Sequence, residues 1–240
     1  MSPAPRLGAL QRGLRGVRRR LAFVFIAFGV GASLTWYFRI QVILFLLAPG
    51  EGSFSATGRP IFTDPAEMFT LSTGLAIKGG FIVAFPVLAY NVYRLLRPLL
   101  TEQQRRYLRY LAPAVALCYL GGMAFAYWVM LPVMLKFLLG FGEGVADPLI
   151  RITDYMDMAV PIIFWMGVVY QLPLIMMLLS KLRLVSYQRM KRLRRYVPAT
   201  AFLIAAFISS TFEFVIPTSL IALFEVGLFL AWVVRPKQVA

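Results

Sequence analysis

Long apolar stretches separated by short charged loops constrain this chain more than any other feature of its sequence. Six such stretches cover residues 21–37, 71–93, 111–141, 158–180, 197–212 and 216–234. Most could cross the roughly 30 Å hydrocarbon core of a bilayer as helices. We expect residues 40–47 to lie along the membrane surface, and residues 197–212 to form a short helix of about 24 Å. The sequence therefore predicts an all-α polytopic membrane protein with six transmembrane helices, the last two of them short.

The composition argues against a soluble enzyme. Hydrophobic residues make up 60% of the chain and charged residues 15%, whereas soluble domains are about one quarter charged. The chain has no histidine and one cysteine, Cys118, which excludes histidine bases, an internal disulfide and a cysteine metal cluster. There is also no phosphate-binding loop and no carboxylate pair with acid–base spacing. We therefore expect no catalytic residue, no metal and no cofactor.

The loop charges predict how the chain is oriented. Twenty basic residues and one acid lie in the N-terminal segment 1–20, the loops 94–109 and 181–195, and the tail 235–240. The alternate loops hold two basic residues and eight acids. The positive-inside rule places both termini in the cytoplasm. We expect a basic cytoplasmic arm (1–20), one membrane domain (21–234) and a cytoplasmic tail (235–240). Anionic lipid, rather than nucleic acid, accounts for the net charge of +15.

Two polar residues lie deep within the apolar stretches. Glu225 is near the middle of 216–234, and Gln171 is deep within 158–180. Such residues either mark functional sites or bond to a neighbouring helix, and the sequence leaves both interpretations open. For Glu225 the functional interpretation is partner binding or proton-linked work, and for Gln171 it is partner recognition. Pro86, Pro132 and Pro161, like Pro173, lie within expected spans and favour kinks.

Several short motifs then recur at spacings that resemble one family. They are the run T-D-P-A-E-M-F at 63–69, Gly80, Pro86 and Tyr90, Pro98 with Arg105 and Arg106, the run G-M-A-F-A-Y at 122–127 with Pro132 and Phe137, the run G-V-V-Y-Q-L-P at 167–173, and L-F-E at 223–225. Together they resemble TatC, the polytopic core subunit of the twin-arginine protein translocase, over about residues 14–234. The resemblance implies a concave six-helix fold in the bacterial inner membrane.

The resemblance also implies a function and partners. TatC-type subunits receive signal peptides with paired arginines at the cytoplasmic face. With single-span TatA and TatB partners, as a hetero-oligomer, they export folded proteins using the proton gradient; self-association is left open. The positions implied for signal-peptide binding are Arg18, Leu95, Glu102, Gln104 and Arg105, and those implied for contacts within the membrane are Gln171 and Glu225.

This chain differs from the family at the residues that would pair with arginine. The two acid positions are occupied by Gly16 and Gln104, while Glu102 lies two residues before the second. Arginine binds best to carboxylates, in two-point hydrogen bonds. Two hypotheses share the fold: a divergent receptor, or a paralogue that scaffolds or regulates other subunits without reading twin arginines. A small-solute transporter is less favoured, because the chain shows no internal repeat.

Overall fold

A computed structural model describes residues 4–50, 60–96, 102–140, 149–181, 187–208 and 215–233. Within these ranges the chain is helical, apart from short turns and an isolated bridge between Ile61 and Arg151. The chain divides into two compact units, which are described separately. Unit 1 comprises residues 1–45 and 62–99, and unit 2 comprises residues 46–61 and 100–240.

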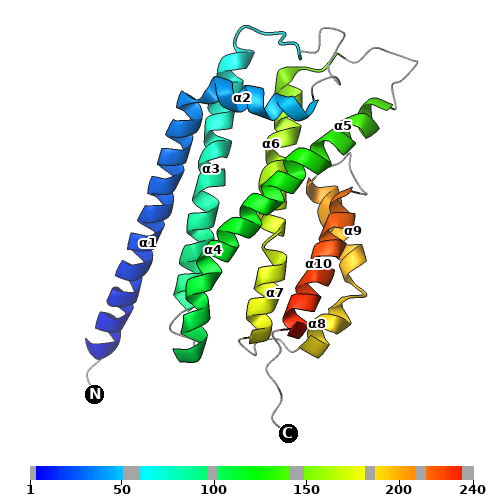
Figure 1. Cartoon of the computed structure of the whole chain (residues 1–240). Helices are drawn as coiled ribbons and strands as arrows, with labels where there is room; N and C mark the ends of the chain where they lie inside the picture. The colour runs from blue at the N-terminus through cyan, green and yellow to red at the C-terminus, as the bar shows by residue number, and fades with distance from the viewer. Residues whose placement is uncertain are drawn as a thin grey trace. The chain divides into compact units, whose positions relative to one another are not determined.

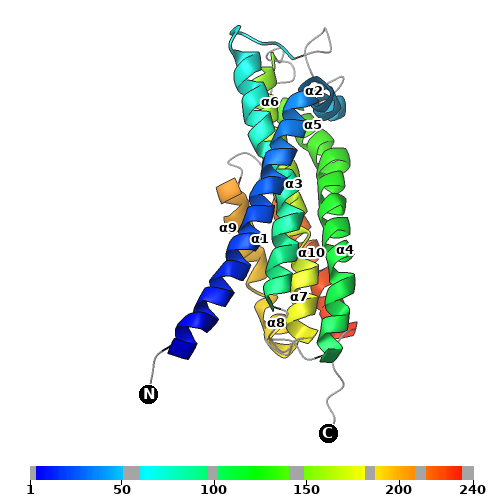
Figure 2. The same ribbon diagram turned by 90° about the vertical axis from the view of Figure 1, so that its left-hand side faces the viewer.

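Unit 1 is built on one pair of long helices. Helix α1 (Ala4–Tyr37) runs beside α3 (Glu67–Leu96), and the two lie together in both views of Figures 1 and 2. Glycines permit the close approach: a methyl group at Gly31 would meet Val83 and the Gly80 backbone, and one at Gly80 would meet the Phe28 carbonyl. In a bilayer, helices attract one another mainly through such close packing, because lipid tails are as apolar as the side chains.

A short helix follows α1. Helix α2 (Arg39–Leu47) leaves α1 at a sharp angle, as Figure 1 shows, and ends in a 3-10 turn, η1 (Ala48–Gly50). Arg39 lies over the Trp36 ring, 5.5 Å from its centre. A cation beside tryptophan is typical of a membrane–water interface. The separate helix at 39–47 matches the bounds of the segment expected at 40–47, and its place along the membrane surface stays a prediction.

Unit 2 contains the remaining helices. Helix α4 (Glu102–Phe125) continues through a π-helical turn, η3 (Ala126–Met130), into α5 (Leu131–Gly140), and Figure 1 shows them as one long path. Helices α6 (Ile152–Val169) and α7 (Leu172–Lys181) form a second, broken path. A short helix α8 (Tyr187–Leu193), α9 (Val197–Ile208) and α10 (Val215–Val233) complete the unit. Helix α10 packs on α7, α8 and α9, and α4 packs on α6.

Of the four prolines expected to kink helices, at positions 86, 132, 161 and 173, two lie just after helix irregularities. Pro132 comes directly after the π turn, in which the Leu131 N–H bonds to the Ala126 carbonyl five residues back. Pro173 follows the turn at residues 170–171 that separates α6 from α7. Proline has no N–H to donate and its ring crowds the carbonyl four residues earlier, which explains both distortions. Pro86 and Pro161, by contrast, lie inside continuous helices.

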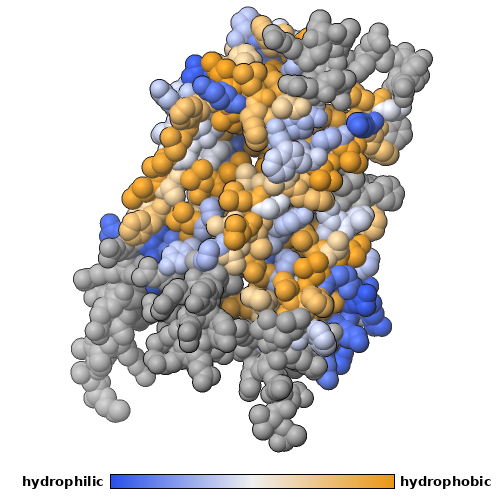
Figure 3. Space-filling model, viewed as in Figure 1, coloured by the Kyte–Doolittle hydropathy of each residue, from blue (hydrophilic) through white to orange (hydrophobic). Residues whose placement is uncertain are grey.

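The expected spans agree with the helices where both are described. Four helical stretches are long and apolar enough to cross a membrane: Arg20–Tyr37, Glu67–Val92, Pro113–Gly140 and Ile152–Ser180. The fifth and sixth expected spans, 197–212 and 216–234, correspond to α9 and α10, although residues 209–214 and 234 lie outside the described part. Figure 3 shows apolar surface over the helices, with hydrophilic residues gathered near α8. The count of six spans and the concave arrangement stay predictions.

Close packing of α4 on α6 yields a test with a neighbouring control. A methyl group at Gly122 would lie 2.6 Å from the Met166 carbonyl oxygen, whereas one at Gly121 would meet nothing within 4 Å. We expect Gly122→Ala to destabilise the protein by about 1–3 kcal/mol, the range for overpacked cores. Gly121→Ala should be neutral or slightly stabilising, because alanine favours helix over glycine. Thermal unfolding of the purified variants in detergent measures both, and equal melting temperatures would contradict this packing.

Candidate functional site

The residues implied for signal-peptide binding lie in two different units. Arg18 is exposed on α1, and Leu95 is next to the last residue of α3, both in unit 1. Glu102, Gln104 and Arg105 form the first turn of α4, in unit 2. The side chains of Leu95 and of the α4 residues lie outside the described part, so their role stays a prediction.

Gln171 lies at the turn between α6 and α7 and is almost fully buried, with 3% of its surface exposed. Its amide nitrogen donates hydrogen bonds to the Val115 carbonyl at 3.2 Å and the Gly167 carbonyl at 3.4 Å. Its amide oxygen has no hydrogen-bond partner among the described residues. The side chain thus fastens α6 to α4 and keeps one buried acceptor available to a donor.

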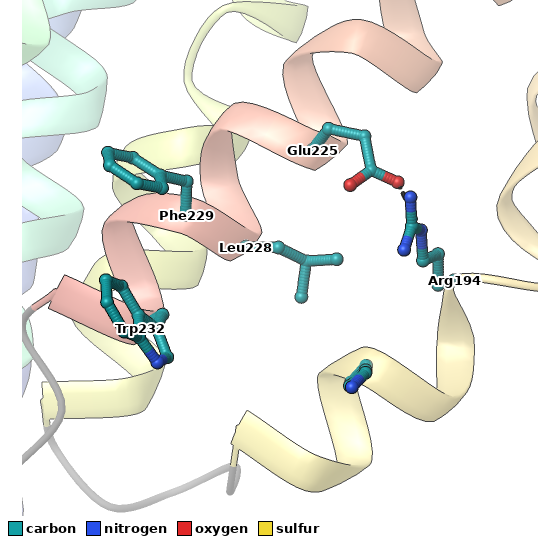
Figure 4. A pocket seen from close by; sticks show the side chains of 6 residues that line it. Arg194, Glu225, Leu228, Phe229 and Trp232 are labelled. Carbon is teal, nitrogen blue, oxygen red and sulfur yellow. Dashed lines mark hydrogen bonds and ion pairs between the residues drawn. The ribbon is translucent and has the colours of Figure 1, made fainter.

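Glu225 has a charged neighbour from a distant part of the sequence. The Arg194 guanidinium donates a hydrogen bond to the Glu225 carboxylate at 2.5 Å, as Figure 4 shows. Arg194 lies just after α8, in the basic segment 181–195, while Glu225 is on α10. The side chains are 60% and 40% exposed. Glu225 therefore connects the basic loop to the last helix.

Gln171 and Glu225 do not form one polar cluster in the described contacts. Gln171 bonds to α4, and Glu225 bonds to the segment after α8. Between α7 and α10 the contacts are close and apolar: a methyl group at Gly227 would meet the Met176 sulfur and the Pro173 backbone. Each polar residue thus has its own surroundings and could serve a different contact.

Glu67, in the motif at 63–69, has a structural role in this geometry. One of its carboxylate oxygens accepts hydrogen bonds from the Thr63 N–H at 2.8 Å, the Thr63 hydroxyl at 3.3 Å and the Asp64 N–H at 3.4 Å. Asp64 in turn accepts the Ala66 N–H at 2.8 Å. Glu67 is only 7% exposed. These bonds fold the chain back onto the first turn of α3, as in a helix cap.

A nearby strand-like contact holds the start of α6. The Ile61 N–H donates to the Ile150 carbonyl at 3.0 Å, and the Ile152 N–H donates to the Ile61 carbonyl at 2.9 Å. Buried Tyr155 donates its hydroxyl to the Leu46 carbonyl at 2.7 Å. Leu46 and Ile61, both in unit 2, are therefore tied to the start of α6.

Sequence reasoning missed one group of residues. Lys191 and Arg194 border a pocket together with Glu225, Leu228, Phe229 and Trp232. Arg194 was one of seven basic residues in a loop, and nothing in the sequence distinguished it from the others. The one signal was that Glu225, an acid within an apolar stretch, needs a basic partner, and the basic loop at 181–195 could have been expected to supply it. Among the described residues, no group of histidine, cysteine, aspartate and glutamate could hold a metal ion.

Comparison with known proteins identifies the family. The profile of the family described as Sec-independent protein translocase protein (TatC) matches residues 13–223. The chain belongs to the TatC family. It is a family of protein translocase components, which are membrane receptors rather than enzymes. This membership confirms the resemblance that the sequence motifs indicated.

Two bacterial relatives match over nearly their whole length. The TatC protein of Koribacter versatilis is 28% identical, covering 99% of this chain and 93% of its own, and that of Aquifex aeolicus is 28% identical, covering 95% and 97%. A chloroplastic TATC of Arabidopsis thaliana is 29% identical over 92% of this chain and 65% of its own. A crystal structure of the twin-arginine translocase receptor TatC superposes with a TM-score of 0.80 at 28% identity, covering 92% of this chain and 98% of that one.

The ion pair in this TatC-family chain gives the second test. Because both side chains are more than one third exposed, water and salt screen their attraction. We expect a double-mutant cycle of Arg194→Gln and Glu225→Gln to give a coupling energy below about 1 kcal/mol. Thermal unfolding in nonionic detergent, at low and at high salt, measures it. A larger coupling that salt leaves unchanged would show that the pair is shielded from water.

Proposed function

We propose that this chain is the core receptor subunit of a twin-arginine protein translocase in a bacterial inner membrane. It binds signal peptides at the cytoplasmic face, recruits single-span TatA- and TatB-type partners and exports folded proteins using the proton gradient. The observation that carries the proposal is the TatC match over residues 13–223 together with the TM-score of 0.80 to a TatC receptor. It forms a hetero-oligomer with those partners.

The proposed orientation has six spans with both termini in the cytoplasm. The charge difference between the loops supports it, because basic loops stay on the cytoplasmic side. Helix α9, with 12 residues, covers about 18 Å, so the final hairpin requires local thinning of the bilayer or burial against other helices.

Impermeant thiol labelling tests that orientation. In a Cys118→Ala background, we expect intact cells to label single cysteines at Glu143→Cys and Ser210→Cys, which the proposal places outside. Lys237→Cys and Arg192→Cys should react only after the membrane is opened, because they lie inside. Labelling in the opposite pattern would reverse the orientation. Failure to label at 210, together with labelling at 143, would contradict the final hairpin.

Signal-peptide binding falls on the first turn of α4 and the N-terminal arm. Position 104 carries glutamine where an acid would pair with arginine, and Glu102 is two residues earlier. Residues two apart in a helix lie about 200° apart around its axis, so positions 102 and 104 belong to different faces of α4. In this proposal Glu102 supplies the remaining carboxylate of the cytoplasmic face, and Arg18, Leu95, Gln104 and Arg105 surround the peptide.

Partner recruitment uses Gln171 and α10. The buried amide oxygen of Gln171 supports the proposal, because it has no hydrogen-bond partner among the described residues and would accept one from a polar group of a single-span helix once the covering side chains moved aside. Glu225 offers a second polar contact on α10, with a carboxylate that is 40% exposed beside Arg194.

A scaffold or regulatory paralogue is the alternative function. The absence of acids at Gly16 and Gln104, on a face with twenty basic residues and one acid, favours it over the receptor. Positive surface repels a peptide with two arginines. A small-solute transporter is a weaker alternative, which vesicle flux assays address.

An export assay decides between receptor and scaffold. The chain serves as the sole TatC subunit in cells with its native partners, and a folded reporter carries a twin-arginine or a twin-lysine signal. We expect export of the twin-arginine form alone. No export by a stably inserted protein would overturn the receptor function in favour of the scaffold.

Restoring the missing acid tests signal-peptide binding directly. We expect Gln104→Glu to raise binding of a twin-arginine peptide about tenfold or more, because a hydrogen bond to a charged group contributes about 1.5–3 kcal/mol. Gln103→Glu is the matched control, since it adds the same charge about 100° around the helix. Peptide binding to the purified full chain measures both variants. An equal gain in both would mean that charge alone, rather than position 104, governs binding.

A further inference from the structure

A pocket of about 350 Å³ lies between α8 and α10, and the partner contact proposed above involves only Glu225 and Arg194 at one end of it. In Figure 4, Arg194 and Glu225 face each other across its upper end, Leu228 points into it, and Trp232 lies further along α10. Its size is within the range of small-molecule sites, about 300–1,000 Å³. Its lining combines cationic, acidic and aromatic side chains.

Leu228, which lines the pocket, belongs to a packed apolar cluster. Leu228 is buried with Met176 of α7 and Met190 of α8, and Phe224 packs against them. Met190 is 4% exposed, so it fastens the short helix α8 to the rest of unit 2. This anchor holds the next residue, Lys191, at the pocket edge, while Arg192 is exposed and is not part of the lining.

The charges of the lining leave one positive charge in excess. Lys191 and Arg194 are cationic, and Glu225 is their acidic counterpart. Glu225 is bonded to Arg194, and the Lys191 ammonium has no acidic partner within the described residues. The pocket is therefore suited to a ligand group with a single negative charge.

The remaining wall is aromatic and open. Phe229 and Trp232 are 62% and 55% exposed, and their rings lie 6.2 Å apart on one side of α10. Tryptophan near the end of a membrane helix is typical of the lipid headgroup level. The ligand that this wall fits has its headgroup beside Trp232 and an apolar part that continues past Phe229 toward the start of α10, into the bilayer.

We propose that the α8–α10 pocket binds an anionic phospholipid, with its phosphodiester beside Lys191 and Trp232 and its acyl chains along Phe229, toward the start of α10. One phosphodiester carries the single negative charge that the lining lacks, and an amphipathic lipid satisfies the cationic and aromatic walls together. Basic pockets beside membrane helices on the cytoplasmic side favour such headgroups. The leaflet rests on the orientation proposed above, whereas lipid binding itself is measured without transport.

Native mass spectrometry of the full chain in nonionic detergent tests the site. The probes are dioleoyl-phosphatidylglycerol, dioleoyl-phosphatidylcholine and inorganic phosphate. We expect phosphatidylglycerol to be retained in preference to phosphatidylcholine. Lys191→Gln should lower that retention about fivefold, the effect of one basic residue near an anionic membrane surface. Arg192→Gln is the matched control, because it removes the same charge from the same helix but outside the pocket, and it should leave retention unchanged.

A second pair of variants tests the aromatic wall. Trp232→Ala should weaken phosphatidylglycerol retention, whereas Trp128→Ala, which removes an exposed tryptophan from η3, should not. Equal losses in Lys191→Gln and Arg192→Gln would overturn the proposal in favour of diffuse charge attraction. Equal retention of phosphatidylcholine would overturn it in favour of apolar adhesion, and competition by inorganic phosphate as effective as that of the lipid would indicate a free-anion site. Failure of export with lipid retained would affect only the proposed transport function.

Discussion

A main-chain N–H or carbonyl that enters a bilayer must find its hydrogen-bond partner within the protein, and the fold follows from that requirement. The described residues are helical almost throughout, so most main-chain groups are hydrogen-bonded within their own helix. Where a proline removes a donor, the backbone adjusts locally: the Leu131 N–H reaches back to Ala126, and the chain turns at residues 170–171 before Pro173. The second adjustment has a consequence for the site, because it places Gln171 at the turn, where its amide bonds to Val115 on α4.

Helix association in this setting depends on close approach rather than on the hydrophobic effect. Glycines supply it in both units, at Gly31 and Gly80 in unit 1 and at Gly122 and Gly167 in unit 2. Polar contacts add specificity. Glu67 closes the turn before α3, and Tyr155 fixes the end of α2 against α6. Motif residues that the family resemblance brought to attention therefore serve the architecture as much as the function.

Charge supplies the second level of organisation. The basic loops set the proposed orientation, and one of them also reaches the last helix through Arg194 and Glu225. The same basic segment provides Lys191. It therefore contributes to the proposed orientation, pairs with Glu225 through Arg194 and forms the cationic edge of the α8–α10 pocket. The cytoplasmic segments carry Gly16 and Gln104 where acids would pair with arginine, which favours a scaffold. The polar residues Gln171 and Glu225 in unit 2 suit partner contacts in a receptor and in a scaffold alike.

The sequence by itself determined the all-helical membrane class, the helices near 71–93 and 111–141, and the TatC family. Apolar length, loop charge and motif spacing are local properties, and they can be read without knowing which helices meet. It also identified Gln171 and Glu225 as unusual, because polar groups at membrane depth are costly. Only the tertiary structure decided what they contact. Val115 is 56 positions from Gln171, and Arg194 is 31 from Glu225. Such pairs depend on how helices pack, since neither partner carries a local sign of the other.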